Sequence, residues 1–175
     1  MNKILSTAFL LLFTHFTFGQ KGRTIFEIDN SVIVPISGHY SFNHYGPSGF
    51  VGSSLGNGFE LLAGAGLNYS ESYEGYETVF LPLSIKINVT NEAKKRSPMM
   101  SLKLGYLYDF DQGSVTRPTV FLEPRAGINF KFNKKNALRT GLGYNMQHLK
   151  ITDYYDDVYK YDIMQAVSAF LTFSF

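Results

Sequence analysis

The sequence predicts an all-β fold, an eight-stranded antiparallel up-and-down transmembrane β-barrel preceded by a signal peptide. Three observations indicate this fold class. Eight segments alternate apolar and polar residues with a period of two, which is typical of strands whose two faces meet different surroundings. The mean hydropathy is −0.06, as expected when one face of each strand is apolar and the other polar. No segment after residue 20 has a helical period.

Composition sets limits on the kind of protein. A length of 175 residues suits one domain, and 16 Gly, 12 Tyr and 16 Phe suit tightly paired, aromatic-rich strands. The net charge of +2 is too small to indicate a nucleic-acid partner. The absence of cysteine excludes disulfides, thiolate metal sites, a cysteine nucleophile and a lipoprotein anchor. We expect no cofactor.

The first 19 residues have the pattern of a secretory signal peptide. Lys3 supplies the positive start, and Ile4–Phe18 is an apolar run too short for a stable membrane helix. Small residues before Gln20 suit cleavage there, so we expect a signal peptide over 1–19 and a barrel domain over 20–175. A retained anchor helix is the alternative.

The first two strands are predicted on patterns of unequal strength. Thr24–Ile36 alternates clearly between apolar and acidic or polar residues. Ser37–Ser48 contains Gly, Pro, Asn and two His, and is predicted to be a loop. The second strand, Gly49–Leu55, has the weakest pattern, and Phe42 is an alternative start. Asn57-Gly58 is a strong signal for a tight hairpin turn.

The remaining six strands follow as consecutive hairpins. They are predicted at Phe59–Tyr69, Glu77–Val89, Met99–Phe110, Thr119–Phe132, Ala137–Leu149 and Tyr159–Phe175. Two of their connections are basic turns, Thr90–Pro98 and Asn133–Asn136. The other three are predicted loops, Ser70–Tyr76, Asp111–Pro118 and Lys150–Val158.

The polar faces of the predicted strands carry the charge, and the opposite faces carry almost none. The charged positions are Glu27, Asp29, Glu60, Lys86, Lys103, Glu123, Arg125, Lys131, Arg139, Lys160 and Asp162. A soluble lipocalin-like binding barrel would turn these residues to water, whereas a membrane barrel would turn them inward. Strands of about 11–16 residues exceed the 5–6 typical of soluble sheets and favour the membrane barrel. Aromatic residues near the strand ends also favour it, because such rings prefer headgroup depth.

Three segments carry a family resemblance. They are Phe18-Gly19-Gln20, the alternating stretch Gly58–Tyr69 and the ending Ala169–Phe175. On these segments the chain resembles small eight-stranded outer-membrane β-barrels of the outer-membrane protein A and opacity type, including the "outer membrane protein beta-barrel" proteins of Bacteroidetes-like bacteria. The resemblance implies a Gram-negative cell outer membrane, periplasmic turns and outward loops.

The same resemblance assigns a role to the end of the chain. In that family an alternating last strand with a terminal aromatic residue is read by the barrel-assembly machinery. Leu171, Phe173 and Phe175 match this assembly signal. A strand that is merely buried would explain the alternation but not the terminal Phe.

The barrel interior should hold an ion-pair network. A barrel of eight strands is just wide enough for its own side chains, so inward charges must compensate one another. The expected participants are Lys86, Lys103, Glu123, Arg125 and Arg139. Such a network favours a polar plug, and a narrow, porin-like pore is the alternative.

Two further features suggest chemistry or binding. His39 and Ser41, with His44 and Ser48 nearby, resemble the spacing in outer-membrane lipid A deacylases, but the motif lies early in the chain. The acidic, tyrosine-rich loops could bind a partner or calcium, although their spacing matches no defined calcium loop. We expect a non-catalytic monomer with a structural or surface-interaction role, with lipid and lipopolysaccharide as partners.

Overall fold

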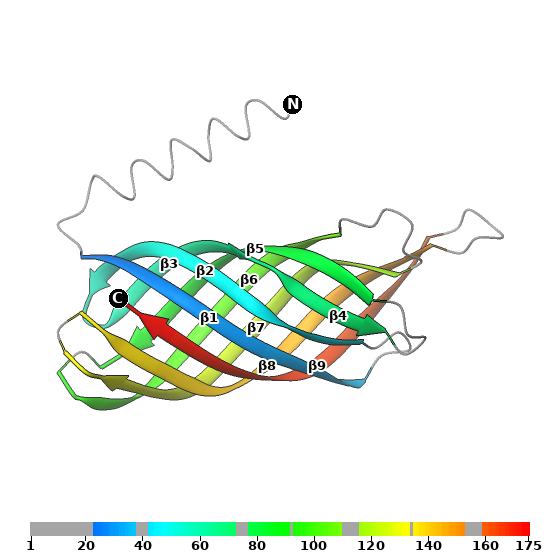
Figure 1. Ribbon diagram of the computed structural model, residues 1–175. Helices are drawn as coiled ribbons and strands as arrows, with labels where there is room; N and C mark the ends of the chain where they lie inside the picture. Colours follow the sequence, from blue (N-terminus) through cyan, green and yellow to red (C-terminus); the bar gives the residue numbers. More distant parts are fainter. Residues whose placement is uncertain are drawn as a thin grey trace, which may run out of the picture.

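The chain forms a closed antiparallel β-barrel (Figure 1). The computed structural model describes residues 23–37, 42–72, 77–91, 93–109, 116–133, 135–152 and 159–175. The predicted signal peptide, 1–19, lies outside these residues. The strands are β1 (Thr24–Ser37), β2 (Phe42–Gly56), β3 (Phe59–Gly66), β4 (Asn68–Ser72), β5 (Glu77–Thr90), β6 (Arg96–Asp109), β7 (Thr116–Lys131), β8 (Ala137–Thr152) and β9 (Tyr159–Ser174).

These segments make eight strands around the barrel. The order is β1-β9-β8-β7-β6-β5-β3-β2, and β2 pairs again with β1. β4 continues the line of β3, because it also pairs with β2 and β5. The predicted eight-stranded antiparallel barrel is therefore confirmed.

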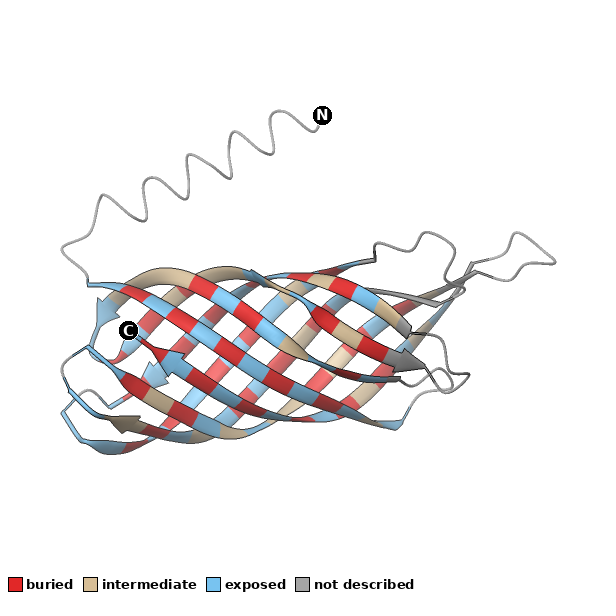
Figure 2. Cartoon of the chain, in the orientation of Figure 1, coloured by how far each residue is buried: buried red, intermediate tan, exposed pale blue. Residues whose placement is uncertain are grey.

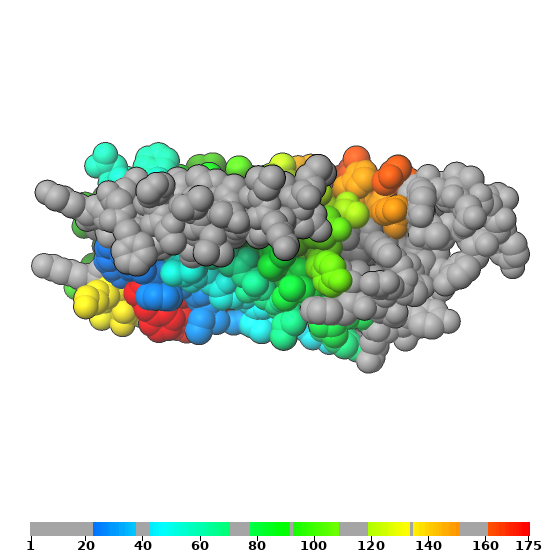
Figure 3. Space-filling model, turned by 90° about the horizontal axis from the view of Figure 1, so that it is seen from above, coloured from blue at the N-terminus to red at the C-terminus, as the bar shows by residue number. Residues whose placement is uncertain are grey.

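The barrel closes between its first and last strands. β1 and β9 pair from Glu27 opposite Ser174 to Ser37 opposite Gln165. In the space-filling view the C-terminal residues, in red, lie against residues of β1, in blue (Figure 3). In an open sheet the backbone N–H and C=O groups of the two edge strands would lack partners, because lipid cannot form hydrogen bonds with them. Closure pairs these groups with each other.

Tight turns gather at one end of the barrel, together with the start of β1 and the end of β9 (Figure 1). We call this the turn end, and the opposite end the loop end. Asn57 and Gly58 both have positive φ, 54° and 83°, as the predicted Asn-Gly hairpin turn requires. A Cβ on Gly58 would overlap the carbonyl oxygen of Thr90.

The prediction for the second strand was wrong in its start. β2 begins at Phe42, the alternative start, so most of the predicted loop Ser37–Ser48 belongs to a strand. Gly, Pro and His suggested a loop, but pairing with β1 on one side and with β3 and β4 on the other supplies the backbone hydrogen bonds of this segment. Tertiary pairing thus overrides a weak local propensity.

The predicted strand Phe59–Tyr69 is interrupted at Leu67. The register against β2 is the same on both sides of the break, with Ser48 opposite Gly66 and Tyr45 opposite Tyr69. This register places Pro47 opposite Leu67, and proline has no N–H to donate to the ladder. Only the bond from the Leu67 N–H to the Pro47 carbonyl remains, at 2.9 Å.

Other strand boundaries extend beyond the predicted ones. β6 already begins at Arg96, inside the predicted basic turn, and β7 begins at Thr116 rather than Thr119. β8 continues to Thr152, and β4 carries pairing to Ser72, inside a predicted loop. Polar residues suggested loops at these positions, but neighbouring strands continue to pair beyond the apolar band.

The two faces of the strands are arranged as a membrane requires. Buried and exposed residues alternate along each strand (Figure 2). Large apolar side chains such as Ile28, Leu83 and Leu104 are exposed, whereas Glu27 and Lys86 are only 2% and 1% exposed. This is the reverse of a soluble lipocalin-like barrel, which buries its apolar face. In water the exposed apolar face found here would be unfavourable.

Within the described part of the chain, no helix is long and apolar enough to span a membrane.

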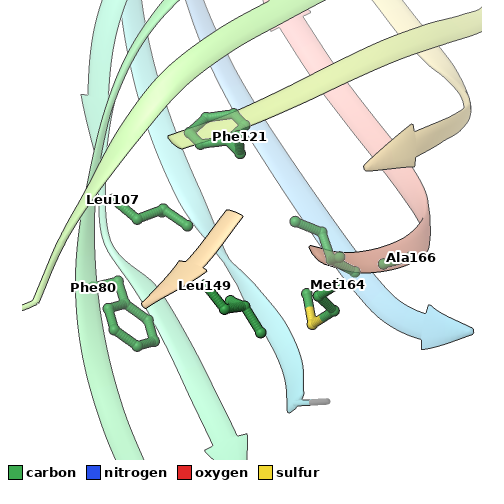
Figure 4. Packing of buried hydrophobic residues seen from close by; sticks show 7 residues of the cluster. Phe80, Leu107, Phe121, Leu149, Met164 and Ala166 are labelled. Atoms are coloured by element: carbon green, nitrogen blue, oxygen red, sulfur yellow. The ribbon is translucent and has the colours of Figure 1, made fainter. Parts of the chain in front are cut away.

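The interior is layered rather than uniformly polar. A cluster of buried apolar side chains lies toward the loop end (Figure 4), together with buried polar residues such as His44 and Gln147. Its members are Ile33, Phe80, Leu107, Phe121, Leu149, Met164 and Ala166. A smaller cluster contains Ile25, Phe50 and Leu62. The buried charges lie on the inward faces of the same strands, so the interior combines ion pairs with apolar packing.

Candidate functional site

Eight charged side chains are buried inside the barrel, counting only the residues that the structure describes. They are Glu27, Asp29, Glu60, Lys86, Lys103, Glu123, Arg125 and Arg139. Each points inward because its neighbours in sequence point to the apolar outer surface, as the strand period dictates. Four acids face four bases, so the formal charges cancel without counter-ions.

Glu27 on β1 is the centre of one half of this ion-pair network. Lys86 on β5 approaches one carboxylate oxygen at 2.8 Å, and the Arg139 guanidinium on β8 pairs with the other. Arg139 also pairs with Glu60 on β3 at 2.7 Å. The amide of Asn88 donates to both Glu27 and Glu60, at 3.1 and 2.9 Å. The strands β1, β3, β5 and β8 are thereby joined across the lumen.

Asp29, two residues along β1, is the centre of the other half. Arg125 on β7 pairs with it at 2.7 Å, and the Thr172 hydroxyl on β9 donates to it at 2.6 Å. Arg125 also binds Glu123 at 3.0 Å, and Glu123 accepts a hydrogen bond from Ser168. Each buried carboxylate therefore has at least one cationic partner, as buried charges require.

Lysine side chains connect the two halves. The Lys86 ammonium lies 3.8 Å from Asp29 as well as 2.8 Å from Glu27, and Lys103 lies 3.8 Å from Asp29. The ring of Phe50 is 5.0 Å from the Lys86 nitrogen and 5.4 Å from that of Lys103. Aromatic faces stabilise cations at such distances, so the ionic layer is continuous with apolar packing.

The structure brings together all five residues that the sequence singled out, Lys86, Lys103, Glu123, Arg125 and Arg139. Sequence reasoning left Glu27, Asp29 and Glu60 out of the network, although it placed them on the polar faces. Charge balance was the missed signal, because four cations and one anion cannot compensate one another inside a sealed barrel.

The acids of the described interior are engaged with one another's cationic partners rather than grouped around an open site. Among the residues described, no group of three or more His, Asp or Glu has the arrangement of a metal site. The interior acids are held by cations and hydrogen bonds. What this arrangement does chemically is to fill the lumen and cross-link its wall.

The deacylase-like residues are only partly described. His39 and Ser41 lie outside the described residues. His44 and Ser48 lie on β2, not in a loop, and both face the interior, with 0% and 4% exposure. The His44 ring packs edge-on against Phe80 at 5.6 Å. A hydrolase acting on membrane lipid needs its reactive groups at the lipid surface, and these two side chains point away from it.

The predicted assembly signal lies on the outer face of the last strand. Leu171, Phe173 and Phe175 are 40%, 41% and 47% exposed. The backbone of Phe175 exchanges two hydrogen bonds with Phe26 of β1, at 2.8 and 3.3 Å. Their side chains are thus available at the surface, and recognition by assembly machinery stays a prediction.

No protein-family model and no curated protein sequence matches this chain. Several solved structures share its fold. The outer membrane protein OprG from Pseudomonas aeruginosa is 10% identical, with a TM-score of 0.54 over 88% of this chain and 96% of that one. The outer membrane protein AlkL, determined in lipid bilayers, is 11% identical, with a TM-score of 0.53 over 89% and 90%. Neisserial surface protein A is 14% identical, with a TM-score of 0.51 over 87% and 98%.

At these identities the likeness shows the fold alone. The chain has the closed antiparallel fold of small outer-membrane β-barrels, and its own surface carries a belt of exposed aliphatic and aromatic side chains. Fold and apolar belt together place the protein in the cell outer membrane, because such a surface is stable only against lipid.

Proposed function

We propose that the protein is a non-catalytic outer-membrane barrel with a sealed lumen, serving envelope integrity or surface interaction. The observation that carries this proposal is the self-compensating ion-pair network, which lies next to an apolar cluster across the same lumen. Opening a water path would require breaking ion pairs and wetting buried apolar groups.

Single-channel recording in planar bilayers tests the seal. We expect the purified, folded protein to give no regular conductance steps, whereas a detergent extract containing a porin serves as the positive control. Reproducible steps of uniform size from folded protein would overturn the sealed lumen and favour the narrow pore.

Absence of catalysis is a separate part of the proposal. His39→Ala and Ser41→Ala, made singly in cells that carry the protein, should leave the acylation of lipid A unchanged by mass spectrometry. If the wild type removes an acyl chain and either variant does not, the protein is a lipid A deacylase and the proposal of a non-catalytic barrel is wrong. The inward direction of His44 and Ser48 supports the non-catalytic reading.

The finer family assignment also belongs to the proposal. The segments Gly58–Tyr69 and Ala169–Phe175 support membership of the opacity-like, Bacteroidetes-type barrels. We further propose a monomer in contact with lipid and lipopolysaccharide, delivered by the barrel-assembly machinery. Closure of the sheet supports the monomer, because no strand edge is left for a second copy to pair with.

A further inference from the structure

Cations gather at the turn end of the barrel. We call this set the basic rim; its members are Arg23, Lys94, Lys95, Arg96, Lys131 and Lys135. They come from the start of β1 and from the two turns β5–β6 and β7–β8. Five of the six are exposed, and Lys131 is half-buried. The described acids lie in the lumen or toward the loop end. Glu92, which precedes Lys94 in the β5–β6 turn, lies outside the described residues, so the turn as a whole carries three cations and one acid.

Contacts between the turns hold these cations on one rim. The Lys131 N–H donates to the Lys95 carbonyl at 2.8 Å, which joins the β5–β6 turn to β7. The Arg23 guanidinium donates to the carbonyl of Lys135, which joins β1 to the β7–β8 turn. Side chains of one sign are thereby held as neighbours, and anions that bind there relieve their repulsion.

The rim lies at the edge of the apolar belt. Arg96 is on the outer face of β6, and its guanidinium carbon is 5.8 Å from the centroid of the Phe130 ring. Phe132, just after β7, is 64% exposed. A cation above a lipid-facing ring is the arrangement expected where hydrocarbon gives way to headgroups.

From these observations we infer that the basic rim binds anionic phospholipid headgroups of the membrane leaflet at the turn end. This inference rests on the proposed membrane barrel and adds a lipid preference to it. In barrels of this fold the short turns are periplasmic, so the leaflet is the inner one. Phosphodiesters there offer charge to the lysines and paired oxygen acceptors to the arginines.

The protein contains no tryptophan, which provides a clean probe. Phe132→Trp places a single tryptophan beside the rim, and Tyr161→Trp places one at the exposed outer surface near the loop end. Each protein is folded into phosphatidylcholine vesicles that contain either brominated phosphatidylglycerol or brominated phosphatidylcholine at equal mole fraction. Bromine quenches only tryptophans that the labelled lipid contacts.

We expect brominated phosphatidylglycerol to quench Phe132→Trp more strongly, with a relative association constant of about threefold or more. This preference should disappear when Lys94→Gln, Lys95→Gln and Arg96→Gln are added. It should also shrink in about 0.5 M salt, because the Debye length falls from about 10 Å at about 0.1 M to about 4 Å. Lys150→Gln removes one charge near the loop end, against three in the triple variant, and should leave the preference intact.

Equal quenching by the two lipids, or a preference that survives the triple substitution, would overturn the inference. A preference of equal size at Tyr161→Trp would show attraction to the whole protein and would overturn it as well. A heat-dependent gel shift verifies that every variant is folded. Conductance of the same vesicles is recorded separately, so a leaky lumen would contradict the proposed function without touching the lipid preference.

Discussion

At the scale of single residues, Glu27 holds together much of the interior. Its carboxylate binds Lys86 and Arg139 and accepts a hydrogen bond from Asn88, and its side chain is fully buried. The pairs themselves contribute little net stability, because burying the charges costs nearly as much as their attraction returns. Breaking one pair is a different matter, since the surviving charge stays buried without compensation.

We expect Glu27→Gln to destabilise the barrel by about 3–5 kcal/mol, because Lys86 and Arg139 lose their shared anion. The double variant Glu27→Gln/Lys86→Met should recover part of this loss by removing one unpaired cation. Urea unfolding in lipid vesicles, followed by the gel shift of the folded barrel, measures both. Additive effects of the two changes would contradict direct coupling.

Gly143 and Gly49 form a matched pair for a second test. A Cβ on Gly143 would lie 2.5 Å from the Ser168 hydroxyl oxygen and 2.9 Å from Cγ of Arg125, whereas one on Gly49 meets nothing within 4 Å. Gly143→Ala should therefore destabilise the barrel by about 1–3 kcal/mol. Gly49→Ala should be close to neutral in the same urea titration. Equal effects would show that crowding at the network is not the cause.

At the scale of strands, the alternation of the faces locks the register. A slip of one residue would turn every inward charge of a strand to lipid and every apolar residue inward. In β7 this would expose Glu123 and Arg125, which now bind each other, and would break the pair of Arg125 with Asp29. The cost of such a slip is a large share of the stability of an ordinary domain.

A single outward charge tests this assignment of faces. Leu104, 49% exposed near the middle of β6, should tolerate arginine poorly, at a cost of about 2–4 kcal/mol at the bilayer midplane. Tyr108→Arg, on the same face near the loop end, should cost about 0–1 kcal/mol. Folding yield into vesicles over a urea series gives both values. A Leu104→Arg variant as stable as the wild type would mean that this face does not meet lipid.

At the scale of the whole molecule, a substitution at Phe175 can distinguish an effect on assembly in the cell from an effect on the stability of the folded barrel. Its side chain is half exposed, while its backbone secures the closure to Phe26. Phe175→Ala keeps those backbone bonds. We expect it to lower the amount of barrel in the outer membrane fraction severalfold while the purified variant unfolds at nearly the wild-type urea concentration.

Phe132→Ala removes a ring at the same end that is more exposed, 64% against 47% for Phe175, and is the control for that experiment. It should reach the outer membrane in wild-type amounts. A parallel fall of both variants, or a Phe175→Ala barrel that is as unstable as it is scarce, would show that the terminal ring is structural and not an assembly signal.

The interior was predictable from the sequence only in part. The period of a strand is enough to place Arg125 and Arg139 inside, because their neighbours in sequence are apolar. The strand period does not predict that Arg125 pairs with Asp29, 96 residues away, or that Arg139 pairs with Glu60, 79 residues away. Phe80 and Leu107 share the inward faces of their strands with Lys86 and Lys103, yet in the folded barrel they belong to an apolar cluster.

The sequence by itself determined the strand type, the strand number and the tight turn at Asn57-Gly58, and its long strands with aromatic ends favoured lipid outside and charge inside. These are local or periodic properties of the chain. Only the tertiary structure decided that β2 begins at Phe42, that β1 closes on β9 and which acid compensates which base. The physical reason is that the curvature of the closed barrel sets which side chains meet across the lumen. A local sequence pattern does not encode these contacts between distant strands.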